Sequence, residues 1–110
     1  MGDNNVVISI STEHKERKAI EIDFVKYELA DPNEMGFKEF AWLENTGGDI
    51  QKLLKGRLTD NKIDQVVELV DKAVKKIVID LPDKVLSKLS DKQKMTIITS
   101  WSEAYKESEG

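Results

Sequence analysis

The chain has 110 residues, 39% of them hydrophobic and 35% charged, with a formal net charge of −4 and no cysteine. This length predicts one domain over residues 1–110, and the mixed charges, which gather into no basic face, exclude a nucleic-acid-binding module. The lack of cysteine excludes disulfides and cysteine zinc sites, and no apolar run is long enough for a membrane span, so we expect a cytoplasmic protein.

The first predicted element is an antiparallel β element over residues 5–30. A β-branched stretch at 6–10 predicts a short strand, and from residue 20 apolar residues alternate with acids in the period of a half-buried strand. The apolar set changes phase at Val25, which indicates a bulge or a break between two strands. We therefore expect two or three strands, with the charged segment 11–18 as an exposed connection and a turn at Asp31-Pro32-Asn33.

After Pro32 the apolar period changes from two to 3.6, which predicts a helical body over residues 35–107. The first helix places Phe37, Phe40 and Leu43 at helical spacing, and we expect it to stop at "NTGG", where paired glycines suit a C-terminal cap. Asp49 is then expected to cap a second helix, which Gly56 weakens and keeps short.

The longest helix is expected over residues 61–79, introduced by Thr59 and Asp60. Its apolar residues follow the spacing i, i+3, i+4, i+7, and acids precede lysines along it, which is the order that the helix dipole favours. Leu69 widens the apolar arc to roughly half of the circumference. The sustained period favours a helix over a strand for the β-branched "KKIVIDL" at its end.

The stretch "LPDKVLSKLSDKQKMTIITSW", residues 81–101, predicts two further helices. Pro82 suits the first turn of a short helix, whose buried face consists of Val85, Leu86 and Leu89. Ser90 and Gln93 form a capping-box pattern before the last helix, which carries an apolar stripe and frays at residues 106–110. The predicted fold class is α+β, with a short N-terminal antiparallel β element on a body of four to five helices.

No pattern in the sequence predicts a catalytic, metal or cofactor site. His14 is the only histidine and lies among charged residues without a positioned partner, and a histidine-based metal centre needs more than one. The acids that follow Asp60 resemble a calcium loop, but its sixth position requires glycine and is Gln65. We therefore expect a protein that is not an enzyme and acts through its surface.

Two apolar helix faces are the predicted sites for a protein partner, because aliphatic and aromatic side chains on a helix face can receive an amphipathic helix. One is the wide arc of helix 61–79, and the other is the stripe of the last helix. The candidate residues are Ile63, Val67, Leu69, Val70, Val74, Ile97, Ile98, Trp101 and Tyr105. The alternative is that the core of the domain itself covers both stripes, which a small domain needs in order to fold.

The order of a β-rich start containing "KYEL", a helical body and the stretch quoted above resembles the small tail assembly chaperones of long-tailed phages and prophages. The likeness covers most of the chain in layout and residues 81–105 in sequence. It implies a protein without catalytic residues that works in the host cytoplasm, where it binds the aggregation-prone tape measure protein and keeps it soluble during tail assembly. Alternatives are a small regulatory adaptor or inhibitor of one globular partner, and a structural tail component, and a homo-oligomer is left open.

Overall fold

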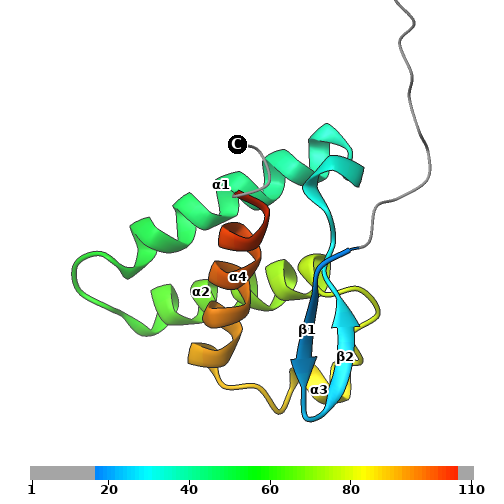
Figure 1. The fold of residues 1–110 in the computed structure, drawn as a ribbon. Helices are drawn as coiled ribbons and strands as arrows, with labels where there is room; N and C mark the ends of the chain where they lie inside the picture. The colour runs from blue at the N-terminus through cyan, green and yellow to red at the C-terminus, as the bar shows by residue number, and fades with distance from the viewer. Residues whose placement is uncertain (1–16, 107–110) are drawn as a thin grey trace, which may run out of the picture.

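A computed structural model describes residues 17–106, in which a β-hairpin precedes the helices (Figure 1). The elements are β1 (Ala19–Ile22), β2 (Val25–Glu28), a 3₁₀ helix η1 (Pro32–Glu34), α1 (Phe37–Leu54), α2 (Asp60–Ile77), α3 (Asp83–Leu86) and α4 (Asp91–Lys106). This is the α+β arrangement expected from the sequence. The predicted strand at 6–10, His14 and most of the predicted connection 11–18 lie outside the described residues.

The change of phase at Val25 is a hairpin turn. β1 and β2 pair antiparallel with Ile22 opposite Val25, so Asp23 and Phe24 alone form the connection. Both turn residues have positive φ, 49° and 68°, as a type I′ turn requires. Such turns match the twist of paired strands, which explains how so short a loop joins them. Of the two alternatives, the break between two strands is therefore confirmed.

α1 continues through Gly47 and Gly48, so the predicted helix stop at "NTGG" and the predicted cap at Asp49 are wrong. Thr46 and Ile50, on either side of the glycines, are only 3% and 2% exposed. Their packing against the rest of the protein holds this turn in the helix, because tertiary contacts outweigh the weak helix propensity of glycine. The predicted two helices are consequently one.

Replacing Gly47 and Gly48 with alanine is expected to stabilise the protein by about 1–2 kcal/mol, since each glycine inside a helix costs roughly 0.5–1 kcal/mol relative to alanine. A Cβ at either position would meet no atom within 4 Å, so the substitution adds no clash. Denaturant melts of the double variant would measure the change. If the pair instead formed a helix cap, alanine would lower the free energy of unfolding.

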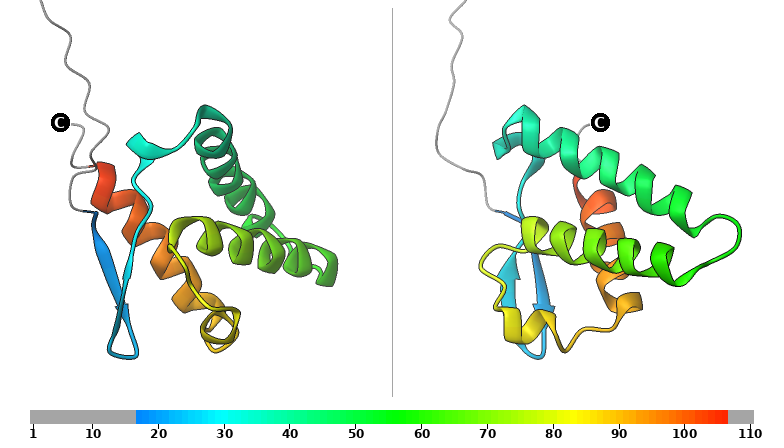
Figure 2. Two further views of the ribbon diagram at one scale, coloured as in Figure 1. Left: turned by 90° about the vertical axis from the view of Figure 1, so that its right-hand side faces the viewer. Right: turned by 180° about the vertical axis from the view of Figure 1, so that it is seen from behind.

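α2 supplies the centre of the core and contacts both α1 and α4 (Figure 2). Its start agrees with the prediction, because Thr59 Oγ1 accepts a hydrogen bond from the Lys62 amide at 3.3 Å. Its end comes at Ile77, two residues earlier than predicted. Val78 instead forms an isolated antiparallel bridge with Leu29, the residue that follows β2, so the β-branched end of this segment pairs with the end of the hairpin.

The start of α4 is the predicted capping box. The Ser90 amide donates to Gln93 Oε1 at 2.8 Å, and the Gln93 amide donates to Ser90 Oγ at 3.1 Å. These two bonds satisfy backbone donors that the first turn of a helix leaves without an intrahelical partner. The capping box therefore fixes the position at which α4 begins, immediately after α3 and its following turn.

Two aromatic side chains of α4 bind the end of the hairpin. Trp101 Nε1 donates to the Ala30 carbonyl at 2.7 Å, and the Tyr105 hydroxyl donates to the Leu29 carbonyl at 3.1 Å. The same hydroxyl accepts from the Lys18 amide at 3.2 Å. Burial raises the pKa of Tyr105, which keeps its hydroxyl a donor. Trp101 and Tyr105 therefore fix the hairpin on α4.

Candidate protein-interaction site

The structure divides the predicted interaction residues between core and surface. Five of them are at most 8% exposed and fill the interior next to α2 and α4: Val70, Val74, Ile97, Trp101 and Tyr105. As the sequence-based alternative stated, these side chains are covered by the protein itself, so we remove Val74, Ile97, Trp101 and Tyr105 from the candidate surface. Ile63 is 43% exposed, and Val67, Leu69 and Ile98 are half-buried.

An apolar groove lies where α1 ends and where α2 and α4 begin. It encloses about 290 Å³, and its apolar lining consists of Leu54, Ile63, Val66, Val67, Val70 and Met95. Asp91 and Lys92, in the first turn of α4, complete the lining. We call this the helical groove. It contains three of the predicted residues, Ile63, Val67 and Val70, the last of them at its base with only 2% exposure.

The helical groove is open because the apolar stripe of α2 is longer than the surface that covers it. Towards the C-terminus of α2, Ala73, Val74 and Ile77 are at most 3% exposed. Towards its N-terminus, Ile63 is 43% exposed. Leu54 at the end of α1 and Leu58 in the following loop are also exposed, by 42% and 49%. Exposed apolar side chains gathered around one groove are typical of a protein-interaction site.

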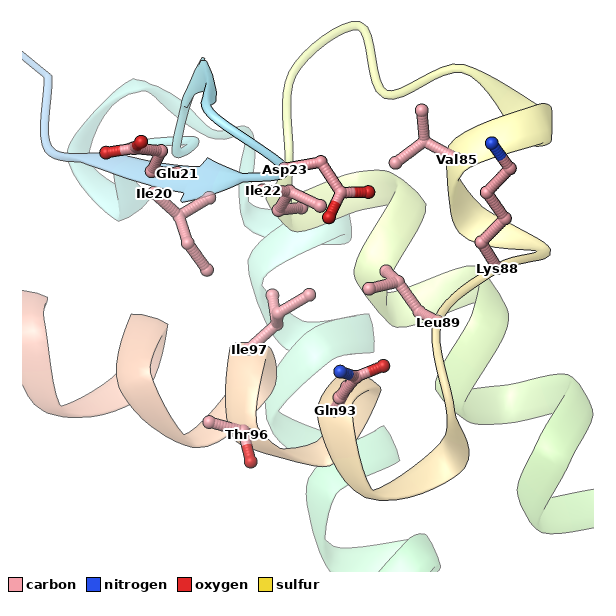
Figure 3. Close-up of a pocket in the computed structure, with 10 residues that line it drawn as sticks. All are labelled: Ile20, Glu21, Ile22, Asp23, Val85, Lys88, Leu89, Gln93, Thr96 and Ile97. Atoms are coloured by element: carbon pink, nitrogen blue, oxygen red, sulfur yellow. The ribbon is translucent and has the colours of Figure 1, made fainter.

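A second groove lies between the hairpin, α3 and α4, and we call it the hairpin groove (Figure 3). It encloses about 330 Å³, and its apolar lining consists of Ile20, Ile22, Val85, Leu89 and Ile97. Its polar lining consists of Glu21, Asp23, Lys88, Gln93 and Thr96. The two acids come from the hairpin, whereas Lys88 follows α3 on the other side. The sequence analysis named one of these residues, Ile97, but did not identify the groove, because its residues come from three separate segments.

Both grooves have an apolar lining that contains a few ionisable residues. The ionisable residues that line the helical groove are Asp91 and Lys92, and those of the hairpin groove are Glu21, Asp23 and Lys88. Across residues 17–106, no three potential ligands of the histidine, cysteine or carboxylate type gather in a geometry that would hold a metal ion. In the same part of the chain, no helix has both the length and the apolar character to cross a membrane.

The likeness to tail assembly chaperones stays a prediction, and the function is therefore argued from the two grooves. The helical groove is the more apolar of the two and coincides with part of the surface expected from the sequence. For that reason we take it as the candidate functional site. No family model, curated protein or solved structure matches this chain.

Proposed function

We propose that the protein binds amphipathic helices through the helical groove, and that its client is the tape measure protein of a long-tailed phage. The observation that carries the proposal is the incomplete cover of the N-terminal half of the apolar stripe on α2, where Ile63 is 43% exposed and Val66 and Val67 are half-buried. An apolar stripe that ends in an open groove is completed when another apolar helix face covers it. The predicted resemblance supports the choice of client.

The lining of the groove suits a client that presents many similar helices. The groove is lined by apolar side chains of α1, α2 and α4. Its affinity for a client therefore depends on the apolar area that is buried and little on the identity of individual side chains. A client helix with large aliphatic residues at i, i+3 and i+4 would place them together on the groove. Each such residue gains about 1.5–3 kcal/mol on burial, and association and ordering costs reduce the sum, so the binding is reversible.

The charges of the protein suit the same task. Charged residues make up 35% of the chain, and its net charge is −4. Proteins with net charge away from zero repel one another, which keeps complexes with apolar clients in solution. Since apolar contact is little affected by screening, the complex should persist at high salt concentration.

A small regulatory adaptor would use the same groove for one fixed partner, and the identity of the client separates the two functions.

Replacing Ile63 with glutamate is expected to weaken client binding at least tenfold, because it places a carboxylate in the apolar groove at a cost of at least about 1.4 kcal/mol. The measurement is co-expression with the tape measure protein encoded in the same genome, followed by gel filtration of the soluble complex. Gln65→Glu is the matched control, since it adds the same charge on an exposed position of the same helix.

We expect the wild type and Gln65→Glu to keep the client soluble and Ile63→Glu to lose it, with circular dichroism unchanged among the three. A client that is no more soluble with the wild type than without it would exclude the chaperone function. Equal binding by Ile63→Glu and the wild type would instead exclude the helical groove as the site.

A further inference from the structure

Phe24 is the most exposed large apolar residue of the hairpin and stands in an unfavourable backbone conformation. Its side chain is 97% exposed, and its φ of 68° lies in the left-handed region. The second position of a type I′ turn favours glycine, because a side chain there is strained. A bulky aromatic residue at this position costs stability, and within residues 17–106 it gains almost no packing in return. Such a residue at a turn indicates a contact outside the chain.

The hairpin groove begins directly beside Phe24, and its two sides carry opposite charges. Glu21 and Asp23 on the hairpin side are acidic, whereas Lys88 on the α3 side is basic. None of these three side chains forms an ion pair within the described residues, and Figure 3 shows Asp23 and Lys88 on opposite sides of the opening, whereas the Glu21 carboxylate points away from it. The apolar residues Val85 and Leu89 lie beside Lys88. The groove therefore offers an apolar floor and unpaired charges of both signs.

We propose that two copies of the chain form a symmetric dimer in which Phe24 of each copy enters the hairpin groove of the other. Phe24 and the hairpin groove are neighbours in each chain. A single two-fold axis can therefore place Phe24 of each copy at the groove of the other copy. In this arrangement the acidic hairpin of one copy meets Lys88 of the other, and the same pair forms twice. Charge complementarity thus makes a second copy the occupant of the groove.

The size of the expected contact predicts a weak dimer. Burying a phenylalanine removes about 150–250 Å² from water, and the dimer buries two of them together with the exposed Val25. An interface below about 1,200 Å² is typical of transient association, so we expect a dissociation constant in the micromolar range. The proposal does not depend on the function of the helical groove, whose lining shares no residue with the hairpin groove.

Phe24→Gly tests the anchor, because glycine relieves the positive φ while it removes the aromatic ring. The variant is therefore expected to fold at least as stably as the wild type. Analytical ultracentrifugation of the full chain over a concentration range from about 1 to 300 μM should show a monomer–dimer equilibrium for the wild type. We expect at least a tenfold weaker dimer for Phe24→Gly. An equally strong dimer of this variant would overturn the proposal.

A pair of charge reversals tests the contact between copies. Asp23→Lys and Lys88→Glu each place like charges together in their own dimer, so each protein alone should dimerise at least threefold more weakly than the wild type. An equimolar mixture of the two restores opposite charges at both contacts and should dimerise more strongly than either alone. A mixture that shows no such gain would contradict the symmetric pairing. A wild type that stays monomeric throughout would overturn the dimer and leave Phe24 as a contact for a different protein.

Discussion

Replacing Trp101 with alanine is expected to lower the free energy of unfolding by about 3–5 kcal/mol, the range for a large aromatic residue removed from a core. Trp101 is 8% exposed, and its ring lies 6.3 Å from that of Tyr105, measured between centroids. The substitution also removes the donor to the Ala30 carbonyl at 2.7 Å. α4 would then lose both packing and one of its polar links to the end of the hairpin.

A smaller aromatic residue at this position separates the contribution of packing from that of the hydrogen bond. Trp101→Phe keeps an aromatic ring in the core but removes the indole donor, so it should cost about 1–2 kcal/mol. Urea melts followed by circular dichroism would measure both variants. Trp42→Ala serves as a comparison, because Trp42 is only half-buried and lies against the Lys76 ammonium, 5.2 Å from the ring centroid. A cost below about 1 kcal/mol for Trp101→Ala, with the fold intact, would contradict the burial of this residue.

The sequence predicted those features that depend on nearby residues. The capping box of Ser90 and Gln93 and the cap at Thr59 follow from the chemistry of a helix start, and the structure contains both. The apolar period also identified the apolar face of the last helix, including Trp101, but left open whether the protein itself or a partner covers it, and the structure shows that Trp101 is buried. Each of these features is settled within about one turn of helix, where the sequence alone contains the necessary information.

Tertiary contacts decided the features that the sequence missed. Gly47 and Gly48 resemble a helix end, but burial of the residues beside them keeps α1 continuous. Phe37 has helical spacing with Phe40 and Leu43 and is nevertheless 95% exposed. A helical period identifies an apolar face but does not determine which part of it other elements cover.

The two candidate grooves follow the same physical rule. The wide stripe of α2 could be predicted from its period, whereas the partial exposure of Ile63 depends on where α1 ends and where α4 begins. The hairpin groove depends on the separation between β1 and the segment that contains Val85 and Leu89. Neither distance is contained in the local pattern of residues, because it results from how the whole chain packs.

The second large effect is expected from the pair formed by Asp71 of α2 and Lys94 of α4. Lys94 is 7% exposed, and its Nζ lies 2.7 Å from Asp71 Oδ1. Asp71→Ala is expected to cost about 2–3 kcal/mol, because it leaves a buried ammonium without its counter-charge. This estimate is below the usual 3–5 kcal/mol for a broken buried pair, since the Asp71 side chain is 38% exposed and water replaces part of the lost contact.

Lys94→Met should cost less than Asp71→Ala, because methionine keeps an apolar side chain of similar length and the Asp71 side chain that it leaves behind is 38% exposed. The double variant should therefore be more stable than Asp71→Ala alone, and denaturant melts of the four proteins would give the coupling energy. If the losses of stability in the two single variants simply add up in the double variant, the coupling energy is zero and the ion pair does not stabilise the protein. The neighbouring Met95 lines the helical groove, so the pair also positions one wall of the proposed binding site. We accordingly expect both variants to weaken client binding, and Asp71→Ala to weaken it more, because it leaves the buried ammonium without its counter-charge.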